Sequence, residues 1–314
     1  MIKLKVASIE PVSDRINLLS LVAEDGAALP VYEAGAHIDF DLGDIGKRSY
    51  SLIDFKPLEA EIMTYQIAVQ REDKGQGGSI AMHRLAQGDV VFVSSPKNDF
   101  QLQVGDKDVL LIAGGIGVTP IISFATECAR NGTNFAFHLA SRSAELCPFR
   151  DRLRQLFGAN LTLWFDAEQM IDLDRVVSSA SSDCHIFCCG PKPMIEAVRA
   201  RAEKAGFPAD RIHFELFSTP MPEDGDQAFE VELASTGEVF TIPAGKTIVE
   251  VLEAADVDVM YDCARGDCGI CQTDVISGTP DHRDVVLSDS ERAAGNVMQI
   301  CVSRAKSARL VLDL

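Results

Sequence analysis

The sequence predicts three domains in one chain: an antiparallel β-barrel, an α/β domain with a parallel sheet, and a small α+β domain at the C-terminus. At 314 residues the chain is too long for one core of ordinary size. Near residue 104 the hydrophobic pattern changes from short alternating runs to a strand–helix repeat. Four cysteines then gather near the C-terminus. We therefore expect domains at residues 1–103, 104–219 and 228–314, with a linker at 220–227.

Residues 1–103 predict the barrel because their apolar runs are short, alternate with polar residues and are interrupted by Gly, Pro and Asp. A period of two places one face of each strand toward a core and the other toward water. The expected strands are Ile2–Val6, His37–Asp41, Tyr65–Gln70 and Val90–Val93.

From Val109 onward, buried strands alternate with helical stretches, which indicates a parallel sheet covered on both faces. The expected strands are Val109–Ala113, Phe135–Ala140, Leu161–Phe165, His185–Cys189 and Ile212–Phe217. The expected helices are Ile121–Arg130, Phe149–Phe157, Leu173–Ser178 and Met194–Ala205, with C-caps at Gly132, Gly158 and Gly206.

The segment Ser218–Gln227 shows no periodicity, contains two prolines and an acidic run, and predicts an interdomain linker. After it, Phe229–Leu233 and Val239–Ile242 predict a hairpin. The residues Thr247–Glu250 then predict a capping box that opens a short helix before the cysteines.

The four cysteines follow the order C-x4-C-x2-C and, after 29 further residues, a lone C: they are Cys263, Cys268, Cys271 and Cys301. This is the plant-type [2Fe–2S] ligand spacing. Glycines between the first three cysteines let backbone N–H groups approach the sulfur atoms. A structural zinc site is the alternative, but zinc ribbons usually pair two C-x2-C knuckles and only one is present. Disulfides are disfavoured because Met1–Ser20 contain no apolar run that would direct export.

The chain carries 47 acidic and 29 basic residues, a formal charge of −18. This balance repels nucleic acid and anionic membrane surfaces. No stretch approaches the roughly 18 uninterrupted apolar residues that a membrane span requires. We therefore expect a cytoplasmic protein that binds neither nucleic acid nor membrane.

The middle domain carries a candidate phosphate-binding turn, Gly114–Pro120, between a predicted strand and a predicted helix. Thr119 suits the N-cap and Pro120 the first helical turn, so that free N–H groups would face a pyrophosphate. A tight turn without a ligand is the alternative, because no full G-x-G-x-x-G is present. The sequence Cys189-Gly190-Pro191 ends the fourth strand of this domain, at the edge where open α/β sheets bind ligands.

In the first domain, Arg48-Ser49-Tyr50-Ser51 offers a guanidinium for a phosphate, a ring to lie along a flat cofactor, and hydroxyls for ring heteroatoms. The turn Gly75–Ser79 precedes a short helical pattern and could bind the same phosphate through backbone N–H groups. Taken singly, the first motif is also an ordinary strand and the second an ordinary hairpin turn.

Together these motifs resemble the phthalate dioxygenase reductase family and the similar reductases of vanillate O-demethylases, over nearly the whole chain. The residues that carry the resemblance are Arg48–Leu52, Gly75–Ser79, Gly114–Pro120, Cys189–Pro191, His213–Phe217 and the four cysteines. The resemblance implies an FMN-binding barrel, an NAD-binding domain and a C-terminal plant-type ferredoxin domain. It also implies that electrons pass from NADH to a terminal Rieske oxygenase. We further expect the protein to be a monomer.

The resemblance also assigns roles to residues. Those expected to hold FMN are Arg48, Ser49, Tyr50, Ser51, Gly77, Gly78 and Ser79, with the backbones of Ala68 and Val69 touching the ring. Those expected to hold the dinucleotide are Gly114, Gly115, Gly117, Thr119, Gly190 and Pro191. The catalytic centre is expected to include Ser51, Thr119, Cys189 and Phe217, the last covering the flavin until nicotinamide displaces it.

Two questions stay open at this point. Arg142, after the second strand of the middle domain, suits the 2′-phosphate of NADPH, whereas Asp166, after the third, suits the ribose hydroxyls of NADH. The resemblance implies NADH. The function also has two alternatives: an NAD(P)H diaphorase or flavin reductase that serves other acceptors, and a redox-sensing iron–sulfur protein.

Overall fold

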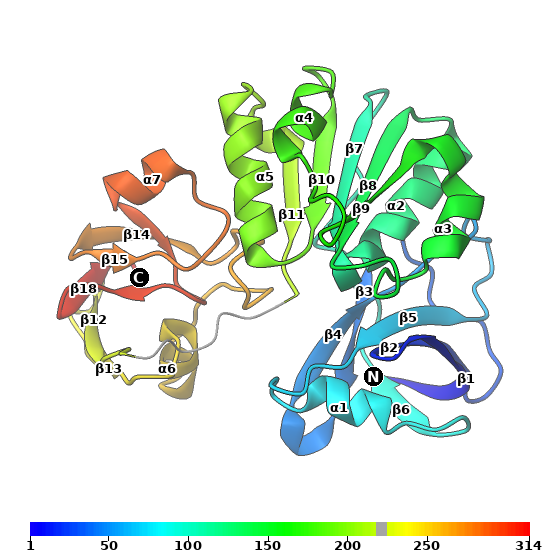
Figure 1. Cartoon of the computed structure of the whole chain (residues 1–314). Helices are drawn as coiled ribbons and strands as arrows, with labels where there is room; N and C mark the ends of the chain where they lie inside the picture. Colours follow the sequence, from blue (N-terminus) through cyan, green and yellow to red (C-terminus); the bar gives the residue numbers. More distant parts are fainter. Residues whose placement is uncertain (218–224) are drawn as a thin grey trace. The chain divides into compact units, whose positions relative to one another are not determined.

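The structure, a computed structural model, describes residues 1–217 and 225–314 (Figure 1). These residues form two compact units, Met1–Phe214 and Glu215–Leu314. The first unit contains a six-stranded antiparallel sheet and a five-stranded parallel sheet, and the second contains a five-stranded mixed sheet and a two-stranded one. The predicted fold class is therefore confirmed. The boundaries at 103/104 and 219/220 stay predictions, and residues 218–224 of the expected linker lie outside the described residues.

The barrel strands have the spatial order β4-β3-β6-β1-β2-β5. They are β1 (Ile2–Ser13), β2 (Ile16–Ala23), β3 (His37–Asp41), β4 (Lys47–Ser51), β5 (Tyr65–Gln70) and β6 (Val90–Val93), with η1 (Gly43–Ile45) and α1 (Gly78–His83) between them. The bounds of β3, β5 and β6 are as predicted, whereas β1 is longer. Strand β2 escaped prediction because Leu18 and Leu19 are both buried, each in a different hydrophobic cluster, so that no alternation is visible.

The barrel closes between its two edge strands, β4 and β5. The Leu52 amide donates to the Ala36 carbonyl at 2.8 Å, which continues the pairing of β4 with β3. The next amide, that of Ile53, donates to the Gln66 carbonyl of β5 at 2.8 Å. The chain thus changes partners within one residue, and this change brings the end of β4 beside β5.

The segment that follows β4 is also bound to helix α2 (Val118–Asn131) of the α/β part of the same unit. Ser123 Oγ donates to the Leu52 carbonyl at 3.0 Å and accepts from the Asp54 amide at 2.9 Å. Thr126 Oγ1 donates to the Asp54 carbonyl at 2.7 Å. Because these groups are buried, the hydrogen bonds join the end of the barrel strand firmly to α2.

The parallel sheet has the order β11-β10-β7-β8-β9. Its strands are β7 (Val109–Gly114), β8 (Phe135–Ser141), β9 (Leu161–Phe165), β10 (His185–Cys189) and β11 (Ile212–Glu215). The other elements are α2, α3 (Arg150–Phe157), α4 (Leu173–Ser178) and α5 (Lys192–Lys204), with η2 (Gly115–Gly117), η3 (Gly158–Asn160) and η4 (Ala209–Arg211). Along β7, Leu111 and Ala113 pack in one cluster with α2 and α3, and the alternate residues Leu110 and Ile112 are equally buried on the other face. Both faces of the sheet are therefore covered, as predicted.

Two details of this sheet correct the prediction. Helix α2 begins at Val118 with Gly117 as its N-cap, so the assignment of Thr119 to the N-cap is wrong. The glycines of η2 tighten into a 3-10 turn that runs straight into the helix, and Thr119 Oγ1 donates to the Ile116 carbonyl at 3.2 Å. Strand β11 also ends at Glu215, two residues before the expected end at Phe217.

The second unit has a sheet of order β13-β12-β18-β14-β16 and a separate pair, β15 and β17. Its elements are β12 (Phe229–Leu233), β13 (Val239–Ile242), α6 (Ile248–Ala254), β14 (Gln272–Ser277), β15 (Pro280–Asp281), α7 (Asp289–Ala294), β16 (Val297–Gln299), β17 (Arg304–Ala305) and β18 (Arg309–Leu312). The predicted hairpin forms β12 and β13, and the predicted capping box, Thr247 with Glu250, opens α6. No helix in residues 1–217 or 225–314 is long and apolar enough to cross a membrane.

Candidate functional site

The four predicted cluster cysteines lie in one connected group of the second unit. Thiols of Cys268 and Cys301 hydrogen-bond to the Cys263 sulfur, and these bonds hold the pKa of Cys263 well below its ordinary value. A hydrogen bond with Cys301 likewise lowers the pKa of Cys271. Cys271 and Cys301 are 3% exposed, whereas Cys263 and Cys268 are half-buried. The sequence prediction that these distant cysteines meet is therefore supported by the geometry.

The backbone of the cysteine loop, residues 263–271, turns so that its amides face sulfur. Ala264, Gly266 and Gly269 all have positive φ, of 51°, 79° and 79°. The turn at Ala264 directs the Arg265 amide to Cys263 Sγ at 3.3 Å. Amide donors of this kind favour the thiolate form, which is the form that binds iron.

These residues fit a [2Fe–2S] cluster. In such a cluster the four cysteines are divided between two irons. Four linked sulfurs with backbone donors and glycine backbones on one loop are the donor set that a binuclear cluster requires.

The two glycine motifs of the parallel sheet meet at the carboxyl ends of β7 and β10, which are neighbouring strands. A Cβ added to Gly117 would lie 2.3 Å from the Cys189 carbonyl oxygen, and one added to Gly190 would lie 3.1 Å from the Gly114 amide nitrogen. Only glycine allows this close approach. Because the chain runs from β7 to β8 on one side and β10 lies on the other, the two motifs border a topological switch point, where α/β sheets bind nucleotides.

The two residues expected to select the nucleotide are also neighbours. The Asp166 amide donates to the Ser141 carbonyl at 3.0 Å, and the Ala167 amide donates to the Arg142 carbonyl at 3.2 Å. The side chains of Arg142 and Asp166 are both exposed at the ends of β8 and β9. The geometry leaves both free to face a ribose and does not choose between them.

In the barrel, Arg48 lies directly against the turn that opens α1. A Cβ added to Gly78 would lie 2.7 Å from Arg48 Cγ and 2.8 Å from its Nε. The guanidinium donates to Gln76 Oε1 at 3.0 Å, and Gly77 adopts the left-handed conformation before the helix. The predicted guanidinium and the predicted glycine turn are therefore brought together, in the arrangement that would hold one phosphate.

The remaining residues predicted to bind flavin differ in whether their polar groups are already hydrogen-bonded within the protein. Ser49 Oγ donates to Asp39 Oδ1 on β3, and Ser79 Oγ accepts from the Glu72 amide, so both hydroxyls serve local structure. Tyr50 is half-buried, and burial raises its pKa to about 12.

Three further predicted residues lie on the strands beside the turn. Ser51 is buried at the end of β4, and Ala68 and Val69 are buried in β5. The Val69 carbonyl lies 2.9 Å from His83 Nε2 and is thus engaged within the protein. The expected backbone contact with the flavin ring is therefore left mainly to Ala68.

The segment after β11 is tied to the cysteine loop within the second unit. The Leu216 amide donates to Asp267 Oδ2 at 2.7 Å, and Arg265 lies 3.5 Å from the same oxygen. Arg265 also lies 3.9 Å from Glu215 Oε1. Phe217, next in the chain, is 41% exposed and thus presents its ring to solvent. The residue expected to cover the flavin therefore directly follows Leu216, which is hydrogen-bonded to Asp267 of the cysteine loop.

Sequence reasoning missed several side chains of the site. Gln299 is fully buried, and its Oε1 accepts from Cys271 Sγ at 3.3 Å. Gln76 supports Arg48, and Asp267 binds the Leu216 amide. The only available signals were their places in the chain, two residues before Cys301 for Gln299 and beside Cys268 for Asp267. Such proximity does not reveal which way a side chain points.

Comparison with known proteins adds four similarities. Residues 231–306 match the family model of the 2Fe-2S iron-sulfur cluster binding domain. The chain is 36% identical to the carnitine monooxygenase reductase subunit of Acinetobacter baumannii, over 98% of this chain and 96% of that protein. It is 37% identical to the phthalate dioxygenase reductase of Burkholderia cepacia, over 100% of this chain and 97% of that protein.

A solved structure of phthalate dioxygenase reductase matches the present structure with a TM-score of 0.73 and 36% identity, over 99% of this chain and 97% of that chain. It is described as a modular structure for electron transfer from pyridine nucleotides to [2Fe–2S].

Proposed function

The chain belongs to the phthalate dioxygenase reductase family, and we propose from this that it passes electrons from NADH through FMN and a [2Fe–2S] cluster to a Rieske-type oxygenase. It is an electron-transfer oxidoreductase, and its acceptor is an oxygenase. One observation on this chain's own structure supports the proposal independently of the family. Four linked cysteine sulfurs in the second unit accompany a first unit in which Gly117 approaches Gly190 and Arg48 approaches Gly78.

When bound, the flavin would supply the conversion between the two-electron chemistry of nicotinamide and the one-electron chemistry of the cluster. The chain's own residues position these groups. Arg48 and the turn at Gly77 and Gly78 would hold the flavin phosphate, and Gly114, Gly117 and Gly190 would admit the pyrophosphate to the backbone. Phe217 would cover the flavin ring and yield its place to nicotinamide. None of these roles requires a side chain that gains or loses a proton.

Three finer features belong to the same proposal. NADH is favoured over NADPH by the family resemblance, whereas Asp166, which suits ribose hydroxyls, and Arg142, which suits a 2′-phosphate, leave both nucleotides open. A monomer suffices because both electron-carrying sites belong to one chain. The cytoplasm suits the chain because all nine cysteines are free of disulfides, as expected in a reducing compartment.

The proposal is tested by mixing the purified protein with NADH or NADPH and freezing samples over time for electron paramagnetic resonance. We expect NADH to bleach the flavin absorbance first and to produce the signal of a reduced [2Fe–2S] cluster afterwards. Capture of the tagged protein from its native cells should then bring down an oxygenase. A cluster that NADH never reduces, although the flavin is bleached, would overturn the relay and favour a flavin reductase.

Replacing Arg48 with alanine should weaken flavin binding by about 10- to 100-fold, because a hydrogen bond to a charged group contributes roughly 1.5–3 kcal/mol. Titration of the apoprotein with FMN, followed by fluorescence quenching, measures the change. Lys47→Ala is the matched control, since Lys47 is the exposed basic neighbour on β4, and its affinity should stay near that of the wild type. Heat-released cofactor should be FMN, and chromatography that shows mainly FAD would contradict this assignment.

Electron delivery to the oxygenase should slow as salt is added. Residues 228–314 carry 15 acidic and 7 basic side chains, so the second unit should steer toward a positive patch on its acceptor. The Debye length falls from about 10 Å at 0.1 M salt to about 3 Å at 1 M, which screens such steering. Stopped-flow rates with the native oxygenase should therefore fall across this range, whereas ferricyanide reduction should hardly change. Equal salt dependence of the two rates would remove the steering hypothesis.

A further inference from the structure

A short buried segment, residues 284–287, lies directly against the cysteine loop. An added Cβ at Gly266 would lie 3.0 Å from Asp284 Cα and 3.2 Å from Asp284 Cβ. The next residue continues this contact, because the Val285 amide donates to the Gly266 carbonyl at 2.9 Å. Val285 itself is 1% exposed. The backbone at 284–285 therefore sets the position of the peptide between Cys263 and Cys268.

The same segment also reaches the other side of Cys268. An added Cβ at Gly269 would lie 3.5 Å from Val286 Cγ1, an ordinary van der Waals distance. Consecutive residues from Asp284 to Val286 thus support both of the positive-φ glycines that flank Cys268. We call residues 284–287 the support segment.

The shape of the support segment depends on the Asp284 side chain, which is fully buried. Its Oδ2 accepts from the Val286 amide at 3.1 Å and from the Leu287 amide at 2.8 Å. Its Oδ1 faces the His282 ring, whose Nδ1 lies 4.0 Å away. Because one carboxylate oxygen accepts from two successive amides, the side chain fixes the turn of the segment that touches Gly266.

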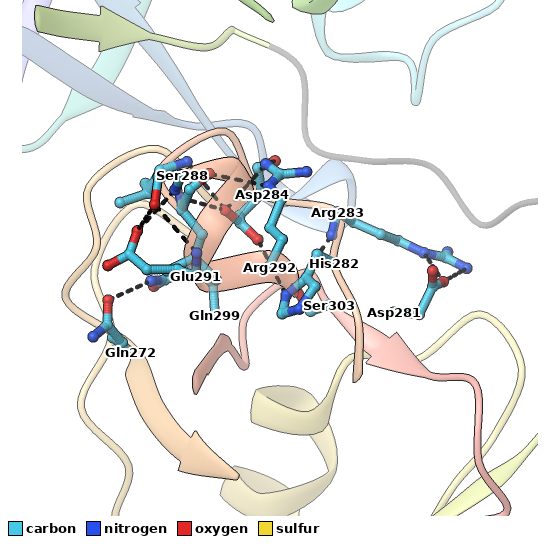
Figure 2. Close-up of polar contacts among 12 residues, drawn as sticks. Gln272, Asp281, His282, Arg283, Asp284, Ser288, Glu291, Arg292, Gln299 and Ser303 are labelled. Carbon is cyan, nitrogen blue, oxygen red and sulfur yellow. Dashed lines mark hydrogen bonds and ion pairs between the residues drawn. The ribbon is translucent and has the colours of Figure 1, made fainter. Parts of the chain in front are cut away.

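Arg292 closes this arrangement from helix α7, as Figure 2 shows. Its guanidinium NH2 lies 3.4 Å from Asp284 Oδ2 and donates to the Asp284 carbonyl, and its Nε donates to the Leu287 carbonyl at 3.0 Å. Helix α7 begins directly after the support segment with a capping box of Ser288 and Glu291, also visible in Figure 2. The start of the helix therefore places Arg292 where its guanidinium contacts both ends of the support segment, Asp284 and Leu287.

We propose that Asp284 and Arg292 are positioning residues for the [2Fe–2S] cluster: the ion pair between the buried Asp284 carboxylate and the partly exposed Arg292 guanidinium fixes the support segment, which in turn fixes the cysteine loop around Gly266 and Gly269. The proposal rests on the proposed function, in which the four cysteines hold that cluster. A buried ion pair adds little net stability compared with apolar residues, but removal of one partner leaves an uncompensated buried charge. The pair thus suits a site where the loop must keep one shape and where nearby charges tune the potential.

The test uses the full chain loaded with flavin and cluster. Asp284→Asn keeps the shape and one amide-accepting oxygen but removes the negative charge, so the cluster's midpoint potential should rise. Arg292→Gln leaves the buried carboxylate uncompensated, so the potential should fall. Both variants should release iron to a chelator about 10- to 100-fold faster than the wild type, the range found when partners around metal ligands are altered. A redox titration followed by electron paramagnetic resonance gives the potentials and the g-values.

Asp281→Asn is the matched control. Asp281 lies three residues before Asp284 and accepts from Arg283 at 2.9 Å, at the right edge of the group of side chains drawn in Figure 2, away from the capping box of Ser288 and Glu291. This variant loses a carboxylate of the same unit and should keep the wild-type potential and release rate. NADH should bleach the flavin at the wild-type rate in all three variants, which separates the effect from damage to the first unit.

The outcomes separate this inference from the function on which it rests. Wild-type protein that retains no iron and no acid-labile sulfide after reconstitution would defeat the proposed function. Wild-type protein that carries the cluster, together with Asp284→Asn and Arg292→Gln variants that match Asp281→Asn in potential, g-values and iron release, would overturn the positioning role alone. Shifts of the two potentials in the same direction would also overturn it, because a general loosening of the fold moves both variants alike.

Discussion

A Cys301→Ser variant is expected to lose its cluster while NADH still bleaches its flavin at the wild-type rate. Cys301 is 3% exposed and hydrogen-bonds to both Cys263 and Cys271, so it joins the lone cysteine to the loop. Its replacement removes a direct ligand, and the reduction of cytochrome c should fall at least about 10- to 100-fold, the range seen for less direct partners of metal sites. Ferricyanide, which takes electrons from the flavin, should still be reduced. Steady-state assays with the two acceptors measure the split.

Cys147→Ser is the control for this variant. Cys147 is a buried free cysteine of the first unit, and burial raises the pKa of its thiol to about 11, which keeps it protonated and inert. Its replacement should leave both activities and the cluster signal unchanged. If flavin reduction by NADH collapsed together with the cluster signal in Cys301→Ser, the two sites would not be separable and the modular relay would be wrong.

A Gly117→Ala variant should lose most of its reduction by NADH. Gly117 has φ of −59°, which any residue adopts, so its backbone conformation does not require glycine. The close approach does, because the new methyl group would lie 2.3 Å from the Cys189 carbonyl oxygen and 2.5 Å from its carbon. The ends of β7 and β10 must then separate, and a misplacement of about 1 Å can cost roughly 100-fold in rate. Stopped-flow measurement of flavin bleaching at several NADH concentrations reports the loss.

Gly132→Ala, at the other end of α2, separates this effect from lost stability. Gly132 has φ of 72°, and nothing lies within 4 Å of an added Cβ, so the variant is strained but not crowded. A left-handed alanine costs about 1–2 kcal/mol of stability, a range similar to the cost of crowding a packed site. It should bleach its flavin at the wild-type rate. A Gly117→Ala variant that used NADH as well as Gly132→Ala does would contradict the nucleotide site.

The sequence was most informative where chemistry imposes a spacing. Cys263, Cys268 and Cys271 lie on one loop, so their spacing is visible in the sequence without a structure. The distant Cys301 then completes the plant-type [2Fe–2S] ligand pattern. Strands of the parallel sheet were found almost to the residue because each is a short apolar run between turn signals. The glycine turn after β7 was recognised as a candidate, but its reason was not. Only the structure shows that Gly117 makes room for the Cys189 carbonyl.

Other features depend on contacts between distant parts of the chain. Strand β2 was missed because both of its faces are covered, and Thr119 was misplaced because a 3-10 turn shifted the start of α2. Asp284 and Arg292 are ordinary charged residues in the sequence, and neither the burial of Asp284 beside the cysteine loop nor its ion pair with Arg292 of α7 can be recognised there. Pattern rules read local periods and spacings, so they do not reach a pair whose partners are set by tertiary packing.

The hydrogen bonds of Leu52 and Asp54 with α2 bear on how genes can rearrange such a chain. A recombination that moved the barrel away from the α/β domain would strip three buried backbone groups of their partners. Each of these hydrogen bonds contributes about 0.5–1.5 kcal/mol net, so the three together are a sizeable share of the stability of a typical domain. Gene duplications, fusions and domain exchanges should therefore keep residues 1–214 together as one unit. The junctions that survive selection should fall near its ends, where evolution is free to attach, replace or delete a neighbour.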